Sequence, residues 1–308
     1  MDPSLASRNR TLQIVRAASD GHYGVLAAIC YNSEHLTALV RAAEAKRSPL
    51  ILLLFPSTVT QLPTLAWAAA AAVKSATVPL SLHLDHAQDE EQIRHVAERL
   101  PFDSIMVDMS HHDHVENLEK TKNLTHICHA HGIAVEAESG RINGGEDGIA
   151  HTGDLEALFT SPAQVEDFIA AGVDLLAPSV GNIHGDYDAR GPQLDLDRLA
   201  TINRQITGRV IMALHGTNDF SPDLMRKCIQ HGAIKLNVNK LLLEVWSAHL
   251  KANAHKPLTQ LMDDGMAVLQ NEVERWWTFA AVPGGRKGRK GCSHITATTP
   301  RRAPSSAV

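Results

Sequence analysis

Short apolar runs alternate with amphipathic segments along most of this 308-residue chain. Each run has about four to eight residues, which is typical of a buried strand, and the segment after it carries apolar residues at helical spacing. Glycines and cap-forming residues stand at many of the expected helix ends. We place the strands at residues 25–31, 50–55, 82–86, 104–109, 133–139, 175–180, 210–215 and 233–238.

Eight strand–helix units follow one another in this pattern, between an opening helix at residues 7–20 and a last helix at 257–279. Such strict alternation over about 250 residues favours a closed parallel barrel over a doubly wound open sheet. The glycine pattern GxGxxG of dinucleotide-binding folds does not follow the first strand. We therefore predict an α/β protein with a (β/α)8 TIM barrel, an extra N-terminal helix and a C-terminal helical extension.

The predicted single domain covers residues 1–279, with the barrel core at about 8–255. Residues 280–308 are rich in Gly, Pro, Ser, Thr and basic residues, and we expect a disordered basic tail there. This tail holds six of the 29 Lys and Arg, so the rest of the chain has 23 against 34 Asp and Glu. An acidic body argues against nucleic-acid binding by the fold itself.

Two other features of the sequence limit where the protein can act. The sequence has no apolar run of about 18 residues, and its N-terminus lacks a signal-peptide pattern, so we expect no membrane association. The four cysteines have no CxxC spacing, which favours free thiols in a reducing compartment such as the cytoplasm.

Polar residues gather where the predicted strands end. In a barrel of this type the carboxyl ends of the strands and the loops that follow carry the chemistry. Taken in chain order, these junctions supply Asn32, Asp85 with His86, Asp108 with Ser110, Glu136 with Glu138, His184 between Gly181 and Gly185, His215 with Gly216, and Asn237 with Asn239.

The histidines in this set suggest a metal site. Taken alone, Asp85 and His86 could be a hydrogen-bonded loop pair with no catalytic role. Three imidazoles and several carboxylates facing one pocket would repel or lack partners without a cation, and three neutral histidines plus an open position is the arrangement of a catalytic zinc. The concentration of such groups at one rim therefore favours a metal centre.

Six ordered blocks between about Arg10 and Leu243 resemble the class II, metal-dependent fructose-bisphosphate aldolase family, which includes tagatose-bisphosphate aldolases. The blocks are His-Leu-Asp-His at 83–86, Ser104–Ser110 with Glu116-Asn117, Glu136–Gly148, Gly181–Gly185, Leu214–Gly216 and Lys235–Asn239. Six blocks in the family's order are far more specific than any one motif. The resemblance implies a barrel enzyme of carbohydrate metabolism, on the glycolytic pathway.

By position, the resemblance implies that His86, His184 and His215 hold one catalytic Zn²⁺. Asp85 would be the acid and base at the aldehyde-side hydroxyl, and Glu146 would move the proton at the ketone's α-carbon. Asp108 and Glu138 match residues beside a second metal or monovalent-cation position. The substrate contacts would come from Asn32, Gly181, Gly185, Gly216, Asn218, Asn237, Asn239 and Lys240.

The phosphate-binding region departs from the family pattern. Gly-Gly-Ser-Gly usually follows the strand-7 histidine, whereas this chain has Gly216-Thr217-Asn218-Asp219. Lys240 replaces a Thr or Ser, and Phe55 replaces a serine that often polarises the ketone. A lysine can bind phosphate as a point charge, and Asp186 and Asp219 would oppose it.

We therefore expect reversible cleavage of a ketose phosphate such as fructose 1,6-bisphosphate to dihydroxyacetone phosphate and glyceraldehyde 3-phosphate. The alternatives are a different ketose phosphate such as tagatose bisphosphate, a metal-retaining sugar-phosphate-binding barrel without turnover, and a lysine-type aldolase. The family precedent implies a homodimer, with the helix carrying Trp276 and Trp277 as a candidate contact. Arg275 is a candidate for the family's C-terminal substrate arginine.

Overall fold

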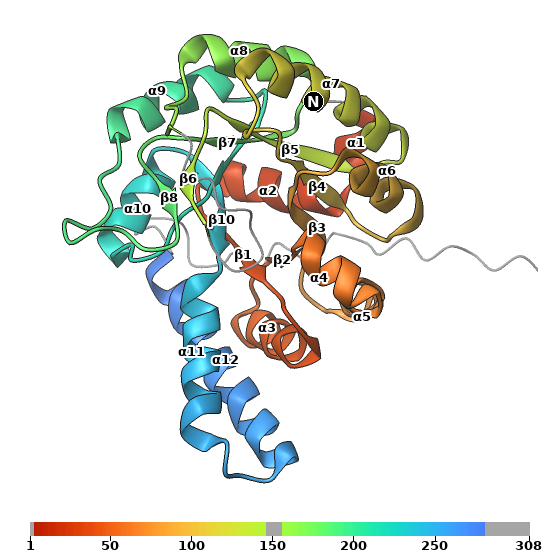
Figure 1. Cartoon of the computed structure of the whole chain (residues 1–308), viewed down its shortest axis with the longest axis vertical. Coiled ribbons are helices and arrows are strands. Elements are labelled where there is room, and N and C mark those ends of the chain that lie inside the picture. Colours follow the sequence, from red (N-terminus) through yellow and green to blue (C-terminus); the bar gives the residue numbers. More distant parts are fainter. Residues whose placement is uncertain (1–2, 146–155, 281–308) are drawn as a thin grey trace, which may run out of the picture.

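A computed structural model describes residues 3–145 and 156–280, and it shows a closed barrel of eight parallel strands ringed by helices (Figure 1). Around the barrel the strands follow the order β1-β10-β9-β7-β5-β4-β3-β2. This arrangement confirms the predicted TIM barrel. The barrel strands are β1 (Val25–Ile29), β2 (Leu50–Leu54), β3 (Leu80–Ala87), β4 (Ser104–Val107), β5 (Ala134–Ser139), β7 (Leu175–Pro178), β9 (Ile211–Leu214) and β10 (Ala233–Val238).

The helices between the strands begin where the sequence offers caps. Side chains of Asn32, Asp89, Asp113, Ser161 and Ser221 each accept a backbone N–H of the helix that follows them, which satisfies a donor that the helix cannot satisfy itself. The helices are α3 (Ser33–Lys46), α4 (Pro56–Gln61), α5 (Pro63–Ser75), α6 (Glu90–Arg99), α7 (His114–Ala130), α8 (Pro162–Ala171), α9 (Leu196–Ile206), α10 (Pro222–Gln230) and α11 (Lys240–Asn253).

Two helices precede the barrel, where the sequence predicted one. They are α1 (Pro3–Arg8) and α2 (Arg10–Gly21), and Asn9 between them caps α2. Leu12 and Val15 of α2 share a buried cluster with inward-facing residues of β1 and β2 such as Val25 and Ile51. Helix α2 thereby packs against the amino-terminal end of the strands.

Two further short strands lie outside the barrel. Strand β6 (Asn143–Gly144) pairs in parallel with β8 (Ile183–His184), which brings the loop after β5 against the loop after β7. The sequence predicted plain loops at both places. Strand β3 also differs, because it begins at Leu80 and extends to Ala87, beyond both ends of the predicted strand at residues 82–86.

The C-terminal helix α12 (Leu258–Ala280) lies within one residue of its predicted bounds at each end. It runs beside α11, and the two helices extend together away from the barrel (Figure 1). Trp276 is 2% exposed and lies in the main core, with Trp277 packed against the same cluster. Both side chains therefore pack within this chain, and a subunit contact through the helix that carries them stays a prediction.

Three of the four cysteines lie within the described residues. Cys30, Cys128 and Cys228 are free and buried, and burial raises the pKa of each thiol to about 12. None of the helices in residues 3–145 and 156–280 has the length and apolar character that crossing a bilayer requires.

Candidate active site and metal centre

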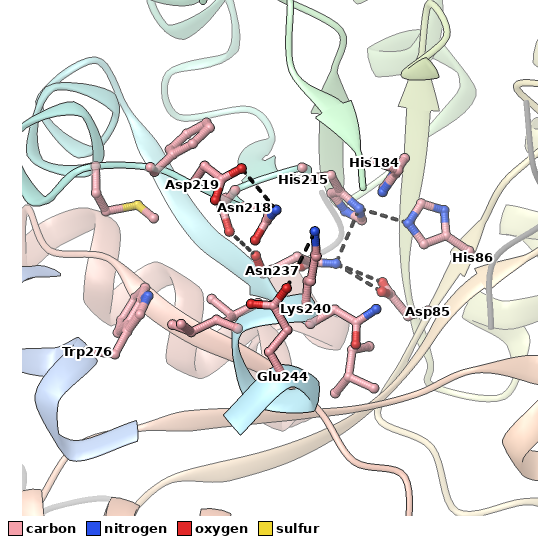
Figure 2. Close-up of a pocket in the computed structure, with 18 of the residues that line it drawn as sticks. Asp85, His86, His184, His215, Asn218, Asp219, Asn237, Lys240, Glu244 and Trp276 are labelled. Atoms are coloured by element: carbon pink, nitrogen blue, oxygen red, sulfur yellow. Dashed lines mark hydrogen bonds and ion pairs between the residues drawn. The ribbon is translucent and has the colours of Figure 1, made fainter. Parts of the chain in front are cut away.

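Three histidine side chains converge at the carboxyl-terminal rim of the barrel (Figure 2). His86 comes from β3, His184 from β8, and His215 directly follows β9. One ring nitrogen from each lies within 4.8 Å of the other two, and all three residues are buried. The sequence prediction that these residues meet is consistent with this geometry.

The backbone at His86 is specialised for this position. Its φ of 50° lies in the left-handed region, which non-glycine residues seldom adopt, and the pairing of β3 with β4 shifts register between Leu84 and Ala87. An irregularity of this kind re-aims a side chain near an active site. It lets Asp85 and His86, which are neighbours in sequence, both reach the rim pocket.

Carboxylates behind two of the rings select the tautomer of each. His86 Nδ1 lies 2.9 Å from Asp108 Oδ2, and His215 Nε2 lies 2.7 Å from Glu136 Oε1. If each of these nitrogens donates to its carboxylate, the other nitrogen carries a lone pair. Those other nitrogens, His86 Nε2 and His215 Nδ1, are only 2.9 Å apart. Two nitrogens this close require either a shared proton or a metal ion between them, and carboxylates behind ligating histidines are the usual outer shell of a metal site.

The pKa values of His86 and His215 indicate that the two rings together hold one positive charge. Burial disfavours the charged form of His86, but Asp85 and Asp108 outweigh it and raise its pKa to about 9. Burial lowers the pKa of His215 to about 4, against the opposing effect of Glu136. One proton is thus held at His86 beside a neutral His215, in the place where a metal ion would bind both nitrogens.

Two glycines allow the loops to close around the histidines. Gly144 has a φ of 102° and pairs with His184, and a Cβ at this position would lie 2.0 Å from the His184 carbonyl oxygen. Gly216 has a φ of 62°, and a Cβ there would lie 2.2 Å from the carbonyl oxygen of Ile183. Any side chain at either glycine would displace the backbone around His184.

Asp85 lies beside the three histidines and is held by a fixed partner. Asn237 Nδ2 donates to both of its carboxylate oxygens, at 3.1 and 3.0 Å (Figure 2). The amide can do so because Lys235 Nζ donates to its Oδ1 at 2.7 Å, which fixes the orientation of the amide group. Burial raises the pKa of Asp85, but Lys235 and His86 outweigh it and hold this pKa well below its usual range. Asp85 is therefore ionised and oriented, as a general base requires.

A second group of ligand atoms shares His86. His86, Asp108 and Glu138 also offer atoms within 4.8 Å of one another. Burial and the nearby Asp108 raise the pKa of Glu138 to about 8, whereas Asp108 stays ionised because His86 and Ser110 outweigh its burial. Two carboxyl groups in one buried site cannot both ionise without a cation. This group fits the secondary metal position that the family resemblance implied for Asp108 and Glu138.

The pocket continues from the histidines toward α11. Its wall includes the turn at residues 216–220 and the N-terminus of α11, with Arg275 and Trp276 of α12 behind them. Asn239 accepts a hydrogen bond from Tyr31 Oη at 2.9 Å and makes no side-chain cap to α11. The first N–H groups of α11 therefore have no side-chain acceptor from their N-cap residue, and such a helix start is suited to anion binding.

Lys240 stands at the edge of this pocket in contact with two carboxylates. Its Nζ is ion-paired with Asp186 from the loop after β8. It also lies 3.5 Å from Glu244 Oε1, one turn along α11 (Figure 2). We had predicted that Asp186 would oppose phosphate binding by Lys240, and the two side chains are in direct contact. Asn218 donates to the Gly185 carbonyl at 3.1 Å, which ties the turn after His215 to the loop after β8.

Most of the predicted site residues share this one pocket. The predicted residues that line it are Asp85, His86, His184, His215, Gly216, Asn218, Asn237, Asn239 and Lys240. Gly181 and Gly185 shape the loop behind it with positive φ angles and are not among the lining residues. Asn32 is the N-cap of α3 and is not among the residues that line the pocket, and its role as a substrate contact stays a prediction. Glu146 lies outside the described residues.

The sequence left three interior residues without a role. Glu136 contacts His215, Lys235 contacts Glu136 and Asn237, and His83 lies near Asp85. All three are fully buried on inward-facing positions of the barrel strands. The alternation of charged with apolar residues in β3, β5 and β10 was the available signal for them.

Comparisons with known proteins agree with the geometry. The family model described as fructose-bisphosphate aldolase class-II matches residues 9–283. A predicted fructose-bisphosphate aldolase of Coccidioides immitis (strain RS) is 43% identical over 282 residues, which cover 89% of this chain and 93% of that protein. A fructose-bisphosphate aldolase of Streptococcus pneumoniae serotype 4 is 36% identical over 232 residues, which cover 74% and 77%.

Solved structures show the same likeness. The crystal structure of the Coccidioides immitis protein superposes with a TM-score of 0.87 at 42% identity, covering 89% of this chain and 96% of the other. The YdjI aldolase from Escherichia coli K12 superposes with a TM-score of 0.77 at 26% identity, covering 88% and 97%. The chain belongs to the class II fructose-bisphosphate aldolase family, which makes it an aldolase and therefore a lyase.

Proposed function

We propose that this protein is a zinc-dependent aldolase that cleaves a ketose bisphosphate, most simply fructose 1,6-bisphosphate, into dihydroxyacetone phosphate and glyceraldehyde 3-phosphate. The observation that carries this proposal is the approach of His86 Nε2 and His215 Nδ1 to 2.9 Å beside an ionised Asp85. The donor set fits zinc, because three imidazoles leave a coordination position open to substrate.

The reaction breaks the bond between C3 and C4 of the ketose, and negative charge develops on the fragment that keeps the carbonyl group. Zinc at His86, His184 and His215 would supply a Lewis acid that stabilises this charge. Asp85 takes the proton of the C4 hydroxyl and returns it in the reverse direction. Asn237 keeps both oxygens of Asp85 in place while this proton moves.

The remaining residues serve the ends of the substrate. The N-terminus of α11 and the turn at residues 216–220 bind the phosphate next to the ketone, with Lys240 as a point charge at the edge. Glu146 transfers the proton at the α-carbon, a role that rests on its place in the family block. Asp108 and Glu138 hold a second metal or a monovalent cation next to His86.

An assay of ketose bisphosphate cleavage with and without chelator tests this function. We expect cleavage of fructose 1,6-bisphosphate that chelator abolishes and zinc restores, with no adduct trapped by borohydride. A trapped adduct would indicate lysine chemistry, and bound metal without cleavage would indicate a sugar-phosphate-binding barrel. Parallel assays with tagatose 1,6-bisphosphate decide the configuration at C4.

We also propose, from the family resemblance, a cytoplasmic homodimer that acts in glycolysis. Light scattering on the purified full chain measures the mass of the assembly. A monomeric mass at micromolar concentration would contradict the dimer and would leave the chemistry of the rim unchanged.

A further inference from the structure

A second layer of charged side chains lies beneath the rim histidines, inside the barrel. His83 and Asp85 of β3 and Glu136 of β5 each offer one ligand atom, and these atoms lie within 4.8 Å of one another. All three residues are at most 1% exposed. We call this group the deep cage. One imidazole and two carboxylates are ligand types that divalent transition metals accept, so the deep cage has the composition of a metal site.

The ammonium group of Lys235 stands in the deep cage. Its Nζ lies 2.9 Å from Glu136 Oε2, 3.1 Å from Glu136 Oε1 and 3.7 Å from Asp85 Oδ1. It also donates to Asn237 Oδ1 at 2.7 Å. Lys235 is fully buried, and such a charge requires compensating partners. The two carboxylates supply that compensation, and in return the ammonium neutralises part of their charge.

His83 completes the wall of the deep cage without bonding to its centre. Its Nδ1 lies 2.7 Å from Ser104 Oγ, which lies 2.9 Å from Thr11 Oγ1 of α2. Its Nε2 lies 3.5 Å from Asp85 and 3.9 Å from Glu136, and it makes no hydrogen bond within the described part of the chain. The imidazole of His83 therefore faces both carboxylates, and the positive charge at the centre of the deep cage belongs to Lys235.

We propose that Lys235 is the permanent cation of the deep cage and that it confines the catalytic metal to the rim. The rim and the deep cage are joined, because Glu136 contacts His215 and Asp85 neighbours His86 in sequence. Without the ammonium, a divalent ion would have a second three-ligand position immediately below the first. Lys235 is thus a positioning residue, and this role rests on the metal centre of the proposed function.

Removing the ammonium should therefore create a metal site. We expect Lys235→Ala, and Lys235→Met as a variant of similar length, to bind about one more Zn²⁺ or Mn²⁺ per chain than the natural protein, measured by elemental analysis after dialysis. Anomalous diffraction should place the added ion among His83, Asp85 and Glu136. The double variant Lys235→Ala/Glu136→Gln should gain no ion, because a ligand is lost. Lys256→Ala, which removes a surface ion pair with Asp264, is the matched control and should also gain none.

Metal content separates this inference from the proposed function. A natural protein that holds no metal at the rim would contradict the proposed function. A folded Lys235 variant that gains no ion would overturn the inference while the rim site stands. If removal of the buried charge prevents the variants from folding, the test uses crystals of the natural protein. Crystals soaked in excess Mn²⁺ should show no anomalous peak in the deep cage, and a peak there would overturn the inference.

Discussion

Replacing Asp108 with asparagine tests how far a carboxylate behind His86 controls the affinity for metal. Asp108 Oδ2 lies 2.9 Å from His86 Nδ1, and Oδ1 accepts from the backbone N–H and the hydroxyl of Ser110 at 3.2 and 2.7 Å. An asparagine has the same shape but carries no charge. Its amide must also place an N–H₂ group against either His86 or Ser110, both of which already present donors.

The expected loss is a factor of about 10 to 100 in metal affinity, the range found when such outer partners of ligating histidines are changed. It corresponds to about 1.4–2.7 kcal/mol. Two effects contribute to it. The carboxylate no longer makes His86 Nε2 a stronger ligand, and the tautomer that presents the Nε2 lone pair is no longer fixed.

The assay is a competition titration of zinc against a chromophoric chelator at fixed pH. Asp167→Asn is the matched control, because Asp167 pairs with His114 Nε2 at 2.9 Å on the surface and should leave the affinity unchanged. An Asp108→Asn protein that is folded and binds zinc within twofold of the natural protein would refute the reasoning, since His86 would then need no carboxylate behind it.

Three further predictions concern the pocket and the core. Asp85→Asn should lower kcat about 10²–10⁴-fold in the cleavage assay and leave metal content unchanged; near-normal turnover would remove Asp85 as the base. Lys240→Ala should raise KM about tenfold for a phosphorylated ketose, whereas Asp186→Asn should lower it by releasing Lys240 from its ion pair; an unchanged KM rules Lys240 out as the anchor. His35 is buried against Trp246, and burial lowers its pKa to about 4. The unfolded chain, with a histidine pKa near 6.5, binds this proton more readily, so His35 costs up to about 3 kcal/mol of stability as pH falls from 6.5 to 4. Denaturant titrations of His35→Phe should lack this part of the pH dependence, and identical curves would contradict it.

The barrel and the meeting of the three histidines at one rim could be predicted from local sequence patterns. Each strand is a short apolar run, and most helices between the strands begin at a residue whose side chain caps them. The polar residues that end the strands must share one rim once the barrel closes. Strand β10 and the helix after Asp89 begin where the pattern places them. Histidines 86, 184 and 215 are far apart in sequence, and the topology alone brings them together.

Other features depend on pairings that no local pattern contains. The two-residue strand β8 exists only because Gly144 lies beside His184. The left-handed backbone at His86 depends on the register between β3 and β4, and nothing in its neighbouring residues requires it. The Lys235–Glu136 contact joins residues on β10 and β5, which are not adjacent strands. The side chain of Asn32 caps α3, as an asparagine before a helix commonly does, and its contact with substrate stays a prediction.

The most direct test of the account is to locate the metal ion. A crystal of the zinc-loaded protein, measured on both sides of the zinc absorption edge, should show one strong anomalous peak at about 2.0–2.1 Å from His86 Nε2, His215 Nδ1 and a nitrogen of His184. If zinc-saturated, cleavage-competent crystals place the ion at other residues and leave these three histidines without it, the account is contradicted.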